Sequence, residues 1–381
     1  MRVLSIFGTR PEAIKMAPVV KALEADEDIE SIVCVTAQHR DMLDQVLELF
    51  GIQPDEDMDL MQPNQSLHQL TARIISGLAP IFEKYQPDAV LVHGDTATCF
   101  SATLAAFYSR IPVGHVEAGL RTYNLEAPFP EEGYRQLTDR LATWYFAPTP
   151  ASEQSLRREG VSSEQIFITG NTVIDALLWM RENLNALKNP EKIYGSATET
   201  IMQGSKKIIL VTGHRRESFG EGFNNICRAI RHIAKENPNV DIVYPVHLNP
   251  KVQEPVFRLL QGYDNIHLIS PLDYENFVRL MDRSYLILTD SGGIQEEAPS
   301  LNKPTLVMRD CTERPEGIEA GVVKLVGTDS ESIATATLEL LSDKTLYQNM
   351  SLAENPYGDG NASTRIVNAL KQYQKPSKRD S

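Results

Sequence analysis

The sequence lacks several features that mark membrane, secreted and nucleic-acid-binding proteins. No hydrophobic run reaches the roughly 20 residues that a membrane-spanning helix needs. Its 4 cysteines lie far apart and form no C-x-x-C pair, which argues against a disulfide framework and against a zinc ribbon. The net charge of −14 disfavours binding to nucleic acid. We therefore expect a cytoplasmic protein with buried, reduced thiols and with neither nucleic-acid nor membrane partners.

Two common nucleotide-binding signatures are missing as well. No G-x-x-x-x-G-K-S/T loop occurs in the chain. Gly220 and Gly222 begin a G-x-G-x-x-G pattern, but Asn225 stands where the third glycine belongs. This segment also does not directly follow a predicted strand. The sequence therefore supports neither a P-loop nor a nicotinamide-binding fingerprint.

What the chain does contain is a regular alternation of short hydrophobic segments with amphipathic ones. This alternation is typical of parallel sheets with helical crossovers. The first series of predicted strands covers residues 3–7, 31–36, 89–93, 113–117 and 145–148. The second series covers residues 207–212, 241–246, 266–269, 286–289 and 304–308. Two series in 381 residues predict an α/β protein with two doubly wound, Rossmann-like domains.

The boundary between the domains is expected between Asn171 and Ser205, where a helix over 173–187 leads into a polar segment. We predict an N-terminal domain over residues 1–172 and a C-terminal, nucleotide-binding domain over residues 173–360. A cluster of Asn, Pro, Gly and Asp ends the second domain. A last helix within residues 361–381 is assigned to the first domain, although the pattern alone does not determine where it packs.

In open parallel sheets, ligands bind beyond the carboxyl ends of the strands, so polar residues there are the first candidates for a site. After the first strand, Gly8 permits a close ligand approach. Arg10 and Lys15 place two cations around the helix that follows, which is typical of an anion site. The alternative is an ordinary strand–helix turn with solvated charges.

The second series repeats this arrangement at two strand ends. His214 follows one strand beside two arginines, which suits phosphate contact or proton transfer but also a simple capping loop. Ser291, Gly292 and Gly293 follow another strand, and their backbone N–H groups would cradle a diphosphate. Glu297 would accept hydrogen bonds from ribose hydroxyls.

Carboxylates follow three further segments of the first series. Asp95 and Glu117 stand at strand ends, and Glu131 opens a helix that also carries Arg135. One carboxylate alone would be read as a helix cap or a solvated loop, whereas three at one sheet edge favour acid–base chemistry. The pairs His93/Asp95 and His115/Glu117 are also candidate ligands of a metal site. No third ligand has a firm spacing, so we predict no metal.

At these positions the chain resembles the non-hydrolysing UDP-N-acetylglucosamine 2-epimerases. The matching segments occur in order along nearly the whole chain and are much more specific together than singly. They are FGTRPEAIK at 7–15, QHR at 38–40, HGDT at 93–96, HVEAGLR at 115–121, GNTVID at 170–175, GHRRE at 213–217, DSGGIQEE at 290–297 and RDCTERPE at 309–316.

The resemblance implies a fold like that of glycosyltransferase family B, with the substrate between the domains, a homodimer and no external redox cofactor. Its implied catalytic residues are Asp95, Glu117, Glu131 and His214. Its implied substrate-binding residues are Arg10, Lys15, Arg135, Leu272, Phe277, Ser291, Gly292, Gly293, Glu297 and Arg314, with Phe277 packed on uracil. A second, regulatory nucleotide-sugar site would involve Gln38, His39 and Arg40.

The implied reaction converts UDP-N-acetylglucosamine into UDP-N-acetylmannosamine for a bacterial-type cell-surface polysaccharide. The C2 proton is weakly acidic because no carbonyl adjoins it. UDP is therefore eliminated across C1–C2 to give 2-acetamidoglucal, and re-addition places the proton on the other face. This chemistry needs a base on one face and an acid on the other. Glu117 with Asp95, and Glu131, are the candidates, and the sequence does not tell which acts on which face.

Three other functions remain open from the sequence. A glycosyltransferase of the same fold would use a UDP-sugar donor. A hydrolysing epimerase would let water reach the glucal and release UDP and free N-acetylmannosamine. A non-catalytic UDP-sugar sensor would keep the binding residues and lose the acids. The presence of Asp95, Glu117, Glu131 and His214 favours an enzyme.

Overall fold

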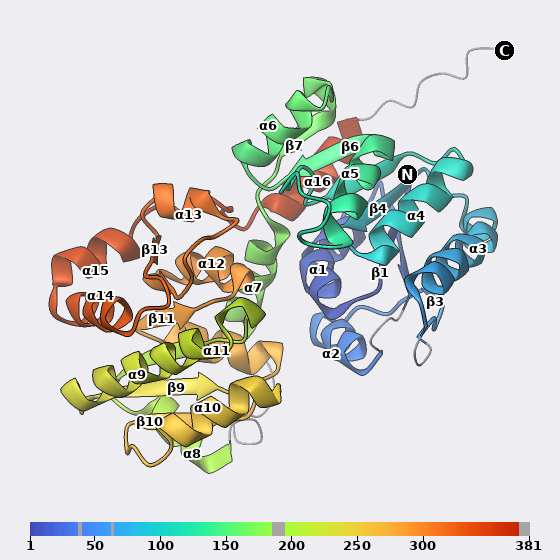
Figure 1. Cartoon of the computed structure of the whole chain (residues 1–381). Helices are drawn as coiled ribbons and strands as arrows, with labels where there is room; N and C mark the ends of the chain where they lie inside the picture. Colours follow the sequence, from blue (N-terminus) through green and yellow to red (C-terminus); the bar gives the residue numbers. More distant parts are fainter. Residues whose placement is uncertain (37–39, 62–64, 185–194, 373–381) are drawn as a thin grey trace, which may run out of the picture. The chain divides into compact units, whose positions relative to one another are not determined.

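A computed structural model describes residues 1–36, 40–61, 65–184 and 195–372 (Figure 1). The chain divides into two compact units, Met1–Ala176 with Gly358–Ser381, and Leu177–Tyr357. Helix α7 (Thr172–Asn183) begins in the first unit and continues into the second.

The first unit is built on a parallel sheet of seven described strands in the order β3-β2-β1-β4-β5-β6-β7. These are β1 (Arg2–Phe7), β2 (Glu30–Val35), β3 (Glu56–Asp57), β4 (Ala89–His93), β5 (Val113–Val116), β6 (Trp144–Ala147) and β7 (Ile166–Ile168). Its helices are α1 (Arg10–Glu24), α2 (Arg40–Phe50), α3 (Leu67–Tyr85), α4 (Ala97–Tyr108), α5 (Glu131–Leu141), α6 (Pro150–Arg158) and α16 (Ala362–Gln372), with a 3-10 turn η1 (Ser163–Gln165).

Successive side chains of each strand point to opposite faces of the sheet. A hydrophobic layer therefore lies on each face, as expected for a sheet covered by helices on both sides. Leu4 and Ile6 of β1 pack with Ile74 and Leu78 of α3. Helix α1 lies against β1 and β2 and also contacts α16, the last described helix, drawn in red in Figure 1. The order of the strands reverses direction between β1 and β4, and ligands of open parallel sheets bind beyond the carboxyl ends of the strands at such a point.

The second unit contains a parallel sheet of six described strands in the order β10-β9-β8-β11-β12-β13. These are β8 (Lys207–Thr212), β9 (Val240–Pro245), β10 (Ile266–Ile269), β11 (Leu286–Thr289), β12 (Thr305–Val307) and β13 (Val323–Leu325). Its helices are α8 (Gly195–Gln203), α9 (Glu221–Glu236), α10 (Pro250–Leu260), α11 (Tyr274–Arg283), α12 (Gly292–Glu297), α13 (Pro315–Glu319), α14 (Ser330–Ser342) and α15 (Lys344–Ser351), with 3-10 turns η3 (Arg216–Ser218) and η4 (Ala298–Leu301).

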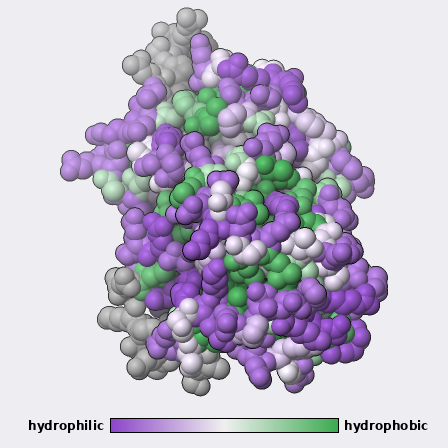
Figure 2. Space-filling view, turned by 90° about the vertical axis from the view of Figure 1, so that its left-hand side faces the viewer, coloured by the Kyte–Doolittle hydropathy of each residue, from purple (hydrophilic) through white to green (hydrophobic). Residues whose placement is uncertain are grey.

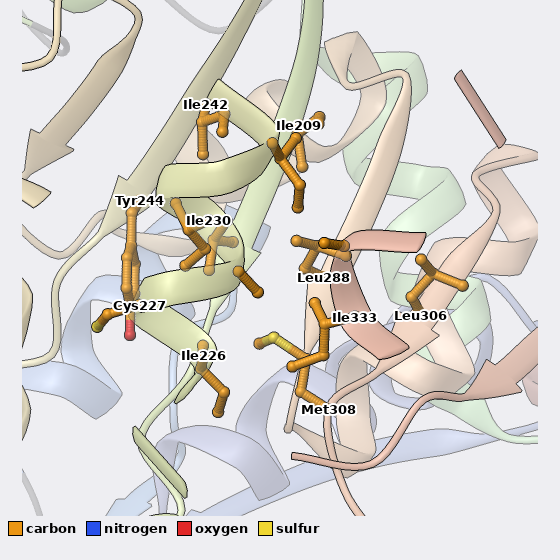
Figure 3. Close-up of a cluster of buried hydrophobic side chains, with 14 of the residues drawn as sticks. Ile209, Ile226, Cys227, Ile230, Ile242, Tyr244, Leu288, Leu306, Met308 and Ile333 are labelled. Atoms are coloured by element: carbon orange, nitrogen blue, oxygen red, sulfur yellow. The ribbon is translucent and has the colours of Figure 1, made fainter. Parts of the chain in front are cut away.

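The core of the second unit lies between its sheet and helices α9, α10 and α14. Figure 3 shows Ile209, Ile242 and Leu288 of the strands facing Ile230 of α9 and Ile333 of α14. On the face drawn in Figure 2, hydrophobic side chains form patches that are bordered by hydrophilic side chains. The prediction of an α/β protein with two parallel, helix-covered sheets is therefore confirmed.

Three strands were not predicted from the sequence. Strand β3 has only two residues, Glu56 and Asp57, and both are acidic. β7 and β13 have three residues each and lie at sheet edges. Even the hydrophobic residues of β7 and β13 form runs too short to be distinguished from loops.

The predicted burial of the cysteines holds for three of the four. Cys34, Cys99 and Cys227 are buried, and burial raises the pKa of Cys34 to about 12. Cys311 is exposed, because it lies in the loop after β12 and not in a hydrophobic segment, so its predicted burial is wrong. In the part of the chain that the structure describes, no helix is both long and apolar enough to cross a bilayer.

Candidate active site

The turn from β1 into α1 is held by a buried carboxylate. Thr9 caps α1 and forms a capping box with Glu12. Glu12 Oε2 accepts the N–H groups of Gly8 and Thr9 at 3.0 and 2.8 Å, and Oε1 accepts the Thr96 hydroxyl at 2.6 Å. A Cβ on Gly8 would lie 1.9 Å from Thr36 Oγ1, so only glycine fits there. Glu12 thus ties the end of β1 to the end of β4.

Glu117 directly follows β5, and both its backbone and its side chain are constrained. Its backbone has a φ of 71°, a left-handed conformation that costs a non-glycine residue free energy. Oε1 accepts an ion-paired hydrogen bond from Lys15 Nζ and a second hydrogen bond from Asn171 Nδ2 at 2.9 Å. The side chains of Lys15 and Glu117 are only 17% and 10% exposed. Lys15 therefore contacts a carboxylate, where an anion-binding role alone had been predicted.

His93, the last residue of β4, faces the same carboxylate. Its Nε2 lies 3.6 Å from Glu117 Oε2. Burial lowers the pKa of His93 to about 3, and the nearby Glu117 only partly offsets that loss of solvation. Neither ring nitrogen has a hydrogen-bond partner among the described residues. His93 is thus a neutral imidazole in contact distance of a candidate catalytic group.

Asp95 and Glu131 occupy the neighbouring loops. Asp95 Oδ2 pairs with Arg135 of α5, at 2.8 Å from Nε and 2.6 Å from Nη2. Glu131 is the first residue of α5, one turn before Arg135. Its neighbour Glu132 is fully buried and accepts the N–H groups of the turn at residues 122–123, so Glu132 is structural. The predicted Arg135 thus joins α5, the helix that begins with Glu131, to the loop that carries Asp95.

A buried ionic network supports these loops from behind. His115 of β5 donates from Nε2 to the carbonyl of Gly94 at 2.7 Å, and its Nδ1 lies 2.6 Å from Asp139. Since both partners are acceptors, the ring carries two protons. Burial opposes this charge, but the Asp139 carboxylate raises the pKa of His115 well above its usual value. Arg121 adds a second cation 2.7 Å from Asp139.

In the second unit, the loop after β8 is organised by Asp290, which follows β11. Asp290 Oδ2 accepts the N–H groups of His214 and Arg215, both at 2.7 Å. His214 Nδ1 lies 3.6 Å from Asp290 Oδ1, and the His214 ring stacks on His247 at 5.3 Å between centroids. Burial is the largest influence on the pKa of His214 and lowers it. The nearby Asp290 raises this pKa, whereas His247 lowers it further.

The glycine-rich turn after β11 packs against an arginine. Ser291 precedes α12, which begins with Gly292 and Gly293. A Cβ on Gly292 would lie 2.5 Å from Arg314 Nη1, whereas one on Gly293 would meet nothing closer than 3.8 Å. Arg314 Nε donates to Glu296 at 2.6 Å, and Glu296 is buried. This places a guanidinium and a turn of backbone N–H groups side by side, as a diphosphate requires.

The remaining predicted residues fall as follows. Arg10 is the first residue of α1, Glu297 is the last residue of α12 and is buried, Leu272 lies in the loop before α11, and Phe277 lies on α11. Gln38 and His39 lie outside the described residues, and only the backbone of Arg40, the start of α2, is described. In the described ranges, no group of three His, Cys, Asp or Glu side chains is arranged to hold a metal ion.

Several residues of the two sites were not predicted as site residues. Asn171, His93 and Asp290 contact predicted residues directly. All three lie within motifs on which the family resemblance was based, so the motifs contained the signal. What the sequence could not show is which motif residue contacts which.

Comparison with known proteins is consistent along the whole chain. The family model for UDP-N-acetylglucosamine 2-epimerase matches residues 21–371. A UDP-N-acetylglucosamine 2-epimerase of Yersinia pestis is 60% identical over 375 residues, covering 98% of this chain and 99% of that protein. The enzyme of Escherichia coli K12 is 58% identical over 373 residues, covering 97% and 98%.

The chain is also similar to solved structures over its whole length. The UDP-GlcNAc 2-epimerase of Neisseria meningitidis, crystallised with UDP-GlcNAc, has a TM-score of 0.86 and 51% identity, covering 98% of this chain and 100% of that one. Staphylococcus aureus MnaA, solved with UDP, has a TM-score of 0.83 and 49% identity, with both chains fully covered.

Proposed function

Because the chain belongs to the UDP-N-acetylglucosamine 2-epimerase family, we propose that it interconverts UDP-N-acetylglucosamine and UDP-N-acetylmannosamine. Membership confirms the predicted family and the predicted enzyme class, an isomerase. The observation that carries the proposal is the carboxylate of Glu117, which the fold holds in a strained backbone conformation and between two fixed donors.

The proposed reaction is an elimination followed by an addition. A base removes the C2 proton, the C–H electron pair becomes the C1=C2 double bond, and the C1–O bond breaks to release UDP. The products of this half-reaction are 2-acetamidoglucal, UDP and a protonated base. In the second half, a proton is added to the opposite face of C2 and a diphosphate oxygen bonds again to C1.

The first unit contains the groups suited to the C2 steps. Glu117 is ion-paired with Lys15, which keeps the carboxylate ionised and thus free to accept a proton. Asp95 is paired with Arg135, and Glu131 opens the same helix. We assign the base to Glu117, supported by Asp95, and the opposite-face acid to Glu131.

The second unit contains the groups suited to the nucleotide. Gly292 and Gly293 present backbone N–H groups beside the guanidinium of Arg314, which would absorb the charge of the departing diphosphate. His214 would contact the same group. The backbone N–H of Ser291, also predicted for this role, instead donates to Thr289 Oγ1 at 2.9 Å. Phe277 would stack on uracil, Leu272 would contact it through its backbone, and Glu297 would bind ribose. Arg10, at the start of α1, is the corresponding cation of the first unit.

The test is proton NMR of UDP-N-acetylglucosamine incubated with the purified protein in D2O, with no added cofactor. We expect UDP-N-acetylmannosamine carrying deuterium at C2. Free N-acetylmannosamine and UDP would instead identify a hydrolysing epimerase. An unchanged spectrum from a protein that still binds UDP would leave the glycosyltransferase or the sensor.

The proposed setting is the cytoplasm, which the four free cysteines support, and the product would supply a cell-surface polysaccharide.

The proposed assembly is a homodimer. It is supported by large hydrophobic side chains on α4 and α5 that are exposed in the single chain, Phe107 at 54%, Tyr108 at 67% and Leu137 at 50%. Sedimentation at micromolar concentration is expected to give twice the chain mass of 42.6 kDa, and a monomer would refute the dimer.

Activation by substrate at a second site near Gln38, His39 and Arg40 stays a prediction. The reverse reaction, started from UDP-N-acetylmannosamine alone, would then accelerate when UDP-N-acetylglucosamine is added. Hyperbolic kinetics without this activation would argue against the second site.

A further inference from the structure

Asn171 lies in the GNTVID motif, which none of the proposed roles has used. It stands between β7 and α7, and it is 3% exposed. Its Oδ1 accepts the N–H of Val173 at 3.1 Å, in the manner of a helix cap. Because Oδ1 is committed to that N–H, the amide cannot be flipped, and Nδ2 is the atom that faces Glu117.

This amide shares one oxygen of Glu117 with a lysine. Asn171 Nδ2 and Lys15 Nζ both donate to Oε1, from two different elements of the first unit, the start of α7 and the first turns of α1. A single donor would leave the carboxylate able to rotate about its last torsion angle. Two donors on one oxygen, added to the left-handed backbone of Glu117, determine the direction in which the other oxygen points.

We propose that Asn171 is a positioning residue for Glu117: its amide holds the carboxylate in the orientation that C2 proton transfer requires. This inference rests on the proposed function and extends that function by assigning the GNTVID motif a part in the reaction. The proposal requires no contact between Asn171 and the substrate.

The competing explanation is that Asn171 only caps α7. Asn171→Ser separates the two roles, since serine is also a good cap for Val173 but its side chain is too short to reach Glu117 as well. Asn171→Asp is a second variant that keeps the cap. It places a carboxylate opposite Glu117 in place of a donor, so its activity loss is expected to grow as the pH rises and the added group ionises.

Asp175 of the same helix offers a matched control. It is buried, and it caps α16 by accepting the N–H groups of Ala362 and Ser363 at 3.2 and 2.8 Å. Asp175→Asn weakens an interaction that holds the fold of the first unit but touches no candidate catalytic residue. It is expected to lower Tm and to leave kcat within about twofold of the wild type.

The experiment measures kcat, KM, UDP affinity, Tm and the isotope effect with C2-deuterated UDP-N-acetylglucosamine for these variants. For Asn171→Ser we expect kcat to fall roughly ten- to a hundredfold, the range for losing one hydrogen bond to a charged group. KM, UDP affinity and Tm should stay close to the wild type. The isotope effect should rise, because C2 proton transfer becomes more strongly rate-limiting.

A wild-type kcat and isotope effect in Asn171→Ser would overturn the proposal. A parallel fall of kcat, UDP affinity and Tm, as from general damage, would also overturn it in favour of capping alone. Failure of the proposed function is a separate result, since the wild-type protein itself would then produce no deuterated UDP-N-acetylmannosamine in D2O.

Discussion

The strand ends of the two units are alike in topology and opposite in chemistry. In the first unit, the residues after β4 and β5 are carboxylates held by cations and amides, as at Asp95 and Glu117. In the second unit, Asp290 after β11 serves to hold the neighbouring loop, the residues after it are small, and the charged partner beside them is the guanidinium of Arg314. The same kind of sheet edge thus provides acid–base groups in one unit and an anion-binding turn in the other.

The difference lies in how much each site depends on buried charge. Glu117 is supported by a fully buried network in which Asp139 balances both His115 and Arg121. The turn at Gly292 depends mainly on the absence of side chains, which leaves backbone N–H groups accessible. Substitutions should therefore affect chemistry and stability in the first unit, and ligand affinity in the second.

The largest expected effect is on turnover. Glu117→Gln keeps an acceptor for Lys15 and Asn171 but cannot remove a proton. We expect kcat to fall roughly a hundred- to ten-thousand-fold, the usual range for a general base, with UDP affinity unchanged by titration calorimetry. Asp95→Asn should also lose most turnover. Wild-type turnover in either variant would remove that residue from the catalytic set.

The next effect is on stability. Asp139→Asn leaves the charge of His115 buried without its anion and leaves Arg121 with Glu159 alone, which should cost about 3–5 kcal/mol. Urea unfolding followed by the fluorescence of buried Trp144, in a Trp179→Phe background, measures this loss in the first unit. The control is Glu30→Gln, which breaks an exposed pair with Arg2 and should change stability by less than about 1 kcal/mol. Equal losses in the two variants would contradict the role given to the buried network.

A smaller effect is expected on UDP affinity. Gly292→Ala would displace the Arg314 guanidinium, and we expect Kd for UDP to rise roughly tenfold, as for the loss of one charged contact. Gly293→Ala has space within the protein, so its Tm should stay at the wild-type value. If Gly293→Ala nevertheless weakens UDP binding, the nucleotide itself must approach that glycine. Unchanged UDP affinity in both variants would argue against a diphosphate site at this turn.

The smallest effect concerns the pH dependence of stability. The pKa of folded His93 is about 3, below the ordinary 6.5. Between these values the unfolded chain binds a proton that the folded chain does not, so stability is lost as the pH falls below 6.5. His93→Gln should remove about 1 kcal/mol of the loss between pH 6.5 and 5.5. Identical pH slopes of the urea midpoint in both proteins would show that His93 is protonated when folded.

The sequence was informative about elements and motifs and much less so about contacts. Long hydrophobic segments such as 207–212 predicted strands correctly, because burial on both faces demands a continuous run. Glu117 was a candidate from its place after a strand, yet its left-handed backbone and its partners Lys15 and Asn171 come from segments up to 102 residues away. Such contacts arise from the order of the strands, which one sequence does not reveal.

The first unit is discontinuous along the chain. Its sheet is complete by Ile168, but α16, which packs on α1 and holds Asp26 through Lys371, comes after the entire second unit. A chain emerging from the ribosome must therefore expose the surface of α1 that α16 covers until the second unit and then α16 have been made. The protein cannot finish its first domain before it has finished its second, so any premature stop late in translation damages the start of the molecule.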